Sequence, residues 1–90
     1  MKPTRYWFIT HPENMYGPGN FGVTAWSVEQ ARSMLKLLLE NMPYLAGLSS
    51  DLDKVNFIED IDVRLLDQGH VTPNMGAVTF LGIWYRKLNM

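Results

Sequence analysis

The stretch Ser27–Met42, SVEQARSMLKLLLENM, decides the fold because it carries the clearest secondary-structure signal in the chain. Ser27 and Gln30 have the spacing of a capping box, in which the hydroxyl accepts one free amide of the first turn and the glutamine reaches back to another. Apolar residues then recur at helical spacing, at Val28, Ala31, Met34, Leu35, Leu38, Leu39 and Met42. Pro43 ends the pattern. We therefore predict one amphipathic helix with a single apolar face.

The segment before this helix predicts two strands. Thr4–Thr10 (TRYWFIT) is aromatic and extended, and Phe21–Trp26 is the second apolar run. Between them, His11–Asn20 contains two prolines and two glycines and is predicted to be a loop. The two-residue period of a strand puts three apolar side chains of the second run on one face, namely Phe21, Val23 and Ala25.

The segment after the helix predicts two more strands. The predicted elements are a loop at Tyr44–Asp53, a strand at Val55–Ile61, a turn or short helical turn at Asp62–Gly69, a loop at His70–Gly76 and a strand at Val78–Arg86. Gly82 interrupts the last strand and is expected to mark a bulge or a close approach. The order ββαββ predicts an α+β fold: a small four-stranded, mainly antiparallel sheet with one helix packed on one face. We predict a single domain over residues 1–90.

Composition excludes several classes of protein. The chain has 90 residues, of which 47% are hydrophobic and 19% charged, as in globular proteins. It contains no cysteine, which rules out disulfides, thiolate zinc sites and cysteine nucleophiles and favours a cytoplasmic location. The apolar run Tyr6–Ile9 is too short for the core of a signal peptide. No run reaches the length of a membrane helix, so we predict no membrane contact.

The net charge of −1 conceals an uneven distribution. Residues 51–67 hold six acidic and two basic residues, a net of −4, and the rest of the chain carries +3. The near-neutral total argues against nucleic acid as the partner. Nucleic-acid binding would require one face to gather the basic residues Arg5, Arg32, Lys36, Arg86 and Lys87.

The predicted sheet is apolar on both faces, although a single helix covers only one of them. In the last strand, Val78, Phe80 and Trp84 alternate with Leu81, Ile83 and Tyr85. The second face is therefore expected to be covered by the loops at 11–20 and 44–53, by a second copy, or by a partner. The leading hypothesis is a non-enzymatic binding protein, of inhibitor or immunity type for example. It would dock a protein partner or its own copy through an aromatic sheet face or edge that includes Trp84 and Tyr85, with the acidic segment adding complementarity.

A polar cluster in the C-terminal half supports an alternative, a small ligand-binding protein or enzyme. Its members are Asp60, Asp62, Asp67, His70 and Asn74. Asp60 and Asp62 would share a strand face about 6.5–7 Å apart, and paired carboxylates can hold a cation or exchange protons. His70 beside Asp67 could serve as a general base. The competing interpretation is a solvated acidic edge with carboxylates that cap turns. No catalytic residue, cofactor or metal is assigned.

The run Gly17–Gly22, GPGNFG, matches the glycine pattern of dinucleotide-binding loops. That pattern must follow a strand directly and open a helix, whereas this one leads into a strand. We therefore predict a turn in which the glycines supply positive φ.

Seven short runs of the sequence, taken together, form a recognisable combination. They are EDIDV at 59–63, LD at 66–67, HV at 70–71, PNMG at 73–76 and GIWY at 82–85, with RYWF at 5–8 and GVTA at 22–25. The combination resembles a pattern in short uncharacterised bacterial proteins. The resemblance implies a bacterial or phage source and brings no activity, cofactor or catalytic residue.

Overall fold

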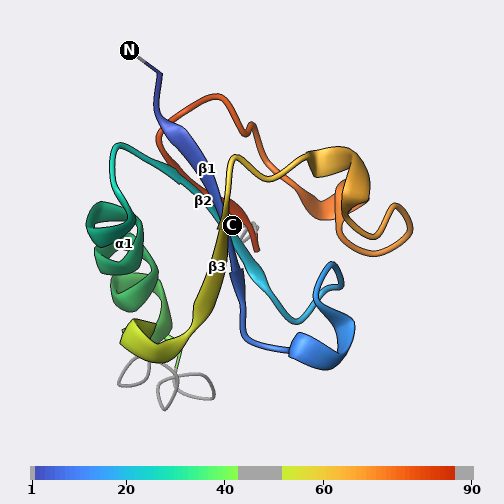
Figure 1. Ribbon diagram of the computed structural model, residues 1–90, viewed down its shortest axis with the longest axis horizontal. Helices are drawn as coiled ribbons and strands as arrows, with labels where there is room; N and C mark the ends of the chain where they lie inside the picture. Colours follow the sequence, from blue (N-terminus) through green and yellow to red (C-terminus); the bar gives the residue numbers. More distant parts are fainter. Residues whose placement is uncertain (1, 43–51, 87–90) are drawn as a thin grey trace.

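The computed structural model describes residues 2–42 and 52–86. It contains a four-stranded antiparallel sheet in the order β3-β1-β2-β4 with one helix on one face, which confirms the predicted α+β class (Figure 1). The elements are β1 (Thr4–Ile9), β2 (Phe21–Ala25), α1 (Val28–Glu40), β3 (Asn56–Glu59) and β4 (Gly82–Tyr85). Pro43, most of the predicted loop at 44–53, and Lys87 lie outside the described residues.

Helix α1 begins where the capping signal predicts. Ser27 is the N-cap, and its Oγ accepts a hydrogen bond of 3.1 Å from the Gln30 amide. The Gln30 side chain reaches back one residue further than a capping box requires, accepting from the Trp26 amide at 2.7 Å. The helix buries its apolar face against the sheet through Ala31, Leu35 and Leu39.

The first face of the sheet forms the core with α1. Tyr6 and Phe8 of β1 are paired in register with Val23 and Phe21 of β2. All four are buried together with the helix, so the prediction that Phe21, Val23 and Ala25 share one face is confirmed. Each such side chain contributes about 1.5–3 kcal/mol when fully removed from water.

The second face is covered by the chain itself. Trp7, Trp84 and Tyr85 pack there against three apolar side chains of the segment that follows β3, Ile61, Leu66 and Val71. Figure 1 shows segments 10–20 and 60–78 on the side of the sheet opposite α1. The chain's own loops do cover this face, but of the two predicted loops only the one at 11–20 contributes among the described residues. Most of the cover comes from residues 60–78, and Leu52 of the predicted 44–53 loop packs in the first-face core instead. The prediction of an open aromatic face is therefore wrong: Trp84 is 2% and Tyr85 5% exposed.

Hydrogen bonds fasten the 10–20 loop to this second face. Trp7 Nε1 donates to the Met15 carbonyl at 2.6 Å, and the Tyr85 hydroxyl donates to the Pro18 carbonyl at 3.1 Å. The loop is held internally by Asn20, which is fully buried and bonds four backbone groups, the amides of Thr10 and His11 and the carbonyls of Asn14 and Gly17. Burial of Tyr85 raises the pKa of its phenol above the ordinary value.

Strand β4 differs from its prediction in two ways. It begins at Gly82 instead of Val78, and residues 78–81 form a turn. Its pairing with β2 passes from Val23–Ile83 to Gly22–Tyr85, so Trp84 is the extra residue of a bulge. This bulge lies two residues beyond Gly82, where it was predicted. Because it breaks the alternation, Trp84 and Tyr85 both join the second-face core instead of opposite faces.

The glycines of the GPGNFG run serve close packing. None of Gly17, Gly19 and Gly22 has positive φ, so the predicted reason for them is wrong; Gly82 is the described glycine that does, at φ 133°. Gly22 lies beneath the Trp84 indole, and a Cβ there would fall within 3.0 Å of three ring carbons. The second face therefore depends on the absence of a side chain at position 22.

We expect Gly22→Ala to lower the free energy of unfolding by about 1–3 kcal/mol, because the indole and the β2 backbone cannot both keep their places. Gly69→Ala is the control, since the nearest atom to a Cβ there is 3.5 Å away. We expect that variant to stay within about 0.5 kcal/mol of the parent. Urea denaturation followed by tryptophan fluorescence measures both. Equal losses would contradict the close-packing role of Gly22.

Candidate functional site

The structure separates the predicted polar residues into two surface motifs. In the first, Asp62 caps a 3₁₀ helix at Val63–Leu65 and accepts from the Arg64 amide at 3.0 Å. The Arg64 guanidinium also donates two hydrogen bonds to the carboxylate, from Nε to Oδ1 at 3.0 Å and from Nη2 to Oδ2 at 2.8 Å. The side-chain and backbone hydrogen bonds from Arg64 lower the pKa of Asp62 to about 2. Asp62 is thus engaged by its own turn.

The second motif joins Asp67, His70 and Asn74. Asp67 Oδ1 accepts from the amides of Gly69 and His70, at 2.8 and 3.1 Å. Its Oδ2 lies 3.0 Å from His70 Nδ1, so the predicted proximity of the two side chains is confirmed. Asn74 Nδ2 donates to the His70 carbonyl at 2.8 Å. Hydrogen bonds hold the pKa of Asp67 below its ordinary value; the bond from the Gly69 amide is the larger cause, and the bond from the His70 side chain is the next.

These motifs do not combine into one polar site. Asp60 follows the last residue of β3 in a turn, with φ 53°, a left-handed conformation that aspartate tolerates at turns, and it is exposed. Across residues 2–42 and 52–86, no hydrogen bond or ion pair links Asp60 or Asp62 to the Asp67–His70 motif. Within the same ranges no three His, Asp or Glu side chains converge as metal ligands. Trp84 and Tyr85, also predicted to bind, lie in the interior.

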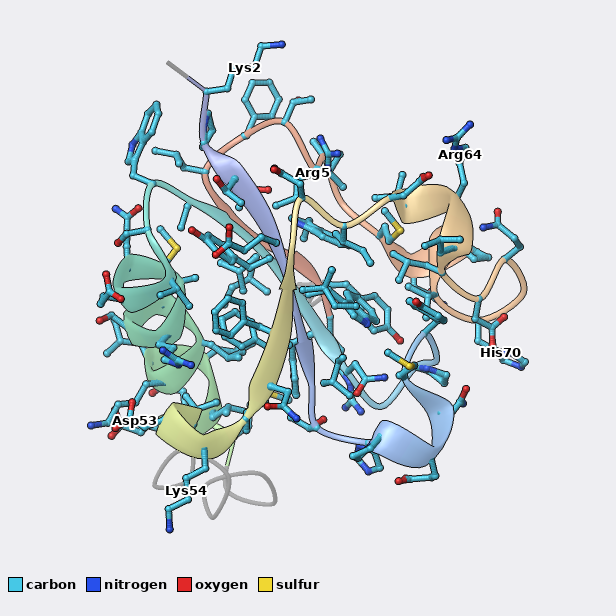
Figure 2. The ribbon with its side chains drawn as sticks, viewed as in Figure 1. Lys2, Arg5, Asp53, Lys54, Arg64 and His70 are labelled. Carbon is cyan, nitrogen blue, oxygen red and sulfur yellow. The ribbon has the colours of Figure 1, made fainter. Side chains whose placement is uncertain are left out.

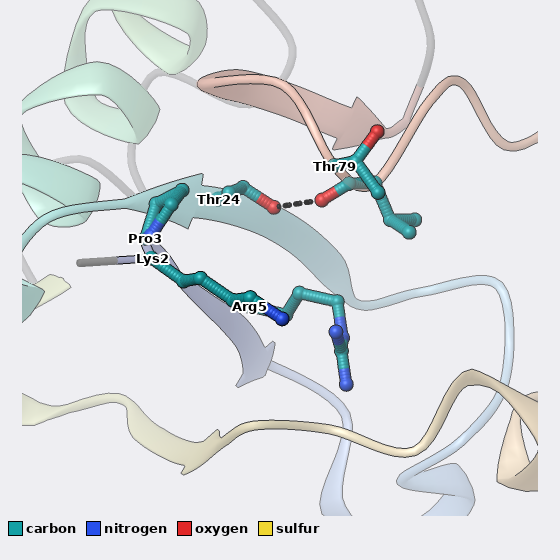
Figure 3. A pocket seen from close by; sticks show the side chains of 6 residues that line it. Lys2, Pro3, Arg5, Thr24 and Thr79 are labelled. Atoms are coloured by element: carbon teal, nitrogen blue, oxygen red, sulfur yellow. Dashed lines mark hydrogen bonds between the residues drawn. The ribbon is translucent and has the colours of Figure 1, made fainter.

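The structure shows instead a cavity at the end of the sheet where β1 begins and β2 ends. Its volume is about 310 Å³, and its lining residues are Lys2, Pro3, Arg5, Thr24, Val78 and Thr79 (Figure 3). Thr24 Oγ1 donates to the Val78 carbonyl at 2.7 Å, which fixes the turn 78–81 against β2. Of the six described residues that line it, two are cationic and none is acidic.

Exposed apolar side chains lie at the same end of the sheet. Phe80 is 72% exposed, Leu81 47% and Trp26 51%. Phe80 follows the cavity residue Thr79. Thr24 of β2 pairs with Gly82 of β4, and the two strands are antiparallel. Trp26, two residues after Thr24, and Phe80, two residues before Gly82, therefore lie at the same end of the sheet. We call these three residues the sheet-end surface. The prediction of a strand over 78–86 concealed it, because that strand would have placed Phe80 and Leu81 within the sheet.

Three of the five basic residues named for a nucleic-acid face have other contacts. The Arg32 guanidinium lies over the Phe57 ring at 5.1 Å, and that of Arg86 lies over Phe21 at 5.6 Å. Arg5 Nε donates to the Ile61 carbonyl at 3.1 Å. Two of these cations therefore cover aromatic rings of the first-face core.

No protein-family model, curated protein or solved structure matches this chain. Among the described residues, no helix is long and apolar enough to pass through a membrane.

The Asp62 carboxyl should titrate near pH 2, and Arg64→Gln should return it toward 3.8, because Arg64 supplies the hydrogen bonds that favour the ionised form. A folded-state pKa below the unfolded one means that ionised Asp62 stabilises the fold above about pH 3.8. That contribution disappears as the pH falls toward 2. Carboxyl carbon shifts measured against pH by NMR give the midpoint. Lys54→Gln is the control and should leave it unchanged; an unchanged midpoint in Arg64→Gln would contradict the assignment.

His70→Ala should raise the pKa of Asp67 only part of the way to its ordinary value, because the Gly69 amide is the larger cause of the lowering. The same NMR titration measures this, with Asp62 as an internal reference in each spectrum. A complete return of Asp67 to its ordinary pKa would show that His70, and not the turn, holds the carboxylate.

Proposed function

We propose that this protein is a small non-enzymatic binding module that docks an acidic protein partner through the sheet-end surface. The observation that carries the proposal is the exposure of Phe80, at 72% the most exposed large hydrophobic side chain of the described residues. Leu81 follows it directly, and Trp26 lies at the same end of the sheet. Leu37 and Leu65 are also exposed, but each belongs to a different element.

The sheet-end surface has the properties of a docking site. Aromatic side chains are enriched among the residues that dominate binding energies, because they bury a large area at little cost in side-chain entropy. Burying Phe80 would contribute about 1.5–3 kcal/mol. The turn that carries it is held at one end by the Thr24–Val78 hydrogen bond and at the other by β4. Little ordering of the backbone would therefore oppose binding.

The positive charge beside the sheet-end surface favours a different protein, and not a second copy of this chain, as the partner. Lys2 and Arg5 line the cavity beside the surface. A symmetric dimer centred on Phe80 would bring these cations of one copy close to those of the other, which opposes association. A partner segment that carries both apolar and acidic side chains would satisfy the surface and the two cations together. An inhibitor or immunity protein is one biological form of such docking. The cytoplasm stays the proposed compartment, on the ground of the cysteine-free sequence.

The Asp67–His70 motif supports an enzyme less well. The His70 side chain is 74% exposed, and neither residue lines the cavity. A general base acts on a substrate that the protein holds beside it, and enclosed pockets supply that hold. The docking function is therefore preferred.

The test is a pair of variants that remove one exposed apolar side chain each. Phe80→Ser alters the sheet-end surface, and Leu37→Ser is the control on the outer side of α1. Tagged wild-type, Phe80→Ser and Leu37→Ser proteins are used to capture proteins from the source cells, and the captured protein is then purified and titrated against all three. We expect Phe80→Ser to weaken binding at least about tenfold and Leu37→Ser to leave it unchanged.

Two results would contradict this function. One is equal affinity of the captured protein for Phe80→Ser and Leu37→Ser. The other is a homodimer of the wild type, seen by sedimentation, that Phe80→Ser dissociates, because it would make the occupant a second copy.

A further inference from the structure

We infer that the cavity lined by Lys2, Arg5 and Thr79 binds a carboxylate group presented by the docked partner. The inference rests on the proposed docking function and adds the chemical group that the partner must supply. The cavity and the sheet-end surface are continuous along the chain, since Val78 and Thr79 line the cavity and Phe80 and Leu81 follow them. A single partner segment can therefore fill the cavity while its neighbouring side chain covers Phe80.

Arg5 is the main anion-binding group. Its Nε donates to the Ile61 carbonyl at 3.1 Å, which orients the guanidinium and leaves both Nη atoms for a ligand. Within residues 2–42 and 52–86, Arg5 forms no ion pair with an acidic side chain. A guanidinium oriented in this way is suited to a carboxylate, which it can bind with two parallel hydrogen bonds.

Asp62 is the acidic side chain whose pKa responds to Arg5, but it does not form an ion pair with Arg5. Arg5 is the least of the causes that lower the pKa of Asp62, so the two charges are only weakly coupled. Both oxygens of Asp62 are already bonded to Arg64. The charge of Arg5 therefore stays available for an external anion.

Lys2 and Thr79 complete the anion-binding character of the cavity. Figure 2 shows Lys2 reaching outward at the end of the molecule where Arg5 lies, and Figure 3 shows Thr79 on the opposite side of the cavity. Thr79 is exposed, and its hydroxyl bonds to no other described residue. The Thr24 hydroxyl, by contrast, donates its hydrogen bond to the Val78 carbonyl. The volume of about 310 Å³ lies within the range of ligand sites and accommodates a side chain that bears a carboxylate.

The experiment uses two small probes that differ only in the carboxylate, N-acetyl-leucine and N-acetyl-leucinamide, with inorganic phosphate as a third. Each is titrated into the protein at constant ionic strength while the amide signals of Thr24, Val78 and Thr79 are followed by NMR. We expect N-acetyl-leucine to shift these signals and to bind at least roughly tenfold more tightly than its amide. Phosphate should bind more weakly than the acid, since it lacks the apolar part.

Two variants of equal charge change locate the site. Lys2→Gln should weaken binding of the acid several-fold, and Lys54→Gln should not, because Lys54 lies at the opposite end of the molecule (Figure 2). Both residues are exposed, so neither substitution threatens the fold. Arg5→Lys keeps the charge but removes the planar fork, and it should weaken the acid more than Lys2→Gln does. Circular dichroism checks that this third variant is folded.

The inference is overturned if the acid and the amide bind equally, if neither shifts the signals, or if phosphate binds more tightly than the acid. These failures leave docking at Phe80 untouched. Tight binding of the acid without any Phe80-dependent partner would overturn the docking function, and with it the partner as the source of the carboxylate.

Discussion

The packing of the Trp84 indole on Gly22 is the contact on which the second face of the sheet depends. Trp84 also stacks on Trp7, with ring centres 5.8 Å apart and planes at 21°. These rings form a platform that residues 10–20 and 60–78 can cover, and the bond from the Asp67 amide to the Tyr16 carbonyl ties the two covering segments together. A side chain at position 22 would lift the indole and separate these layers.

Closure of the second face leaves no aromatic face of the described sheet open for the proposed partner. A sheet with aromatic side chains on both sides would expose one of them if a single helix were its only cover. Here the chain itself buries Trp7, Trp84 and Tyr85. The exposed aromatic side chains Phe80 and Trp26 lie outside the strands. Phe80 and Leu81 precede the first residue of β4, and Trp26 follows the last residue of β2. The proposed docking site is therefore at the end of the sheet and not on its face.

Local signals in the sequence predict the elements of this fold, and long-range contacts explain what they miss. The Ser27 cap, the apolar face of α1 and the shared face of Phe21, Val23 and Ala25 follow from spacing alone. The bulge at Trp84 does not, since alternation assumes that every residue of a strand has a partner. The cavity could not be predicted either, because it brings together residues 2–5, 24 and 78–79. Turn capping by Asp62 and Asp67 is consistent with the sequence, but so is a binding site, because residue type and spacing are the same in both cases.

The net charge of a segment is a poor guide to a binding site. A better guide is whether each charged side chain already has a partner within the fold. Residues 51–67 carry a net −4 and therefore attract attention in the sequence. Yet Asp62 is held by Arg64, and Asp67 is held by the amides of its own turn and by His70. Lys2 and Arg5 are ordinary by composition, but they line a cavity to which the described part of the chain contributes no acidic side chain. An external ligand gains most where the fold leaves charge unmatched beside apolar surface, and in the described part of this chain that place is the end of the sheet.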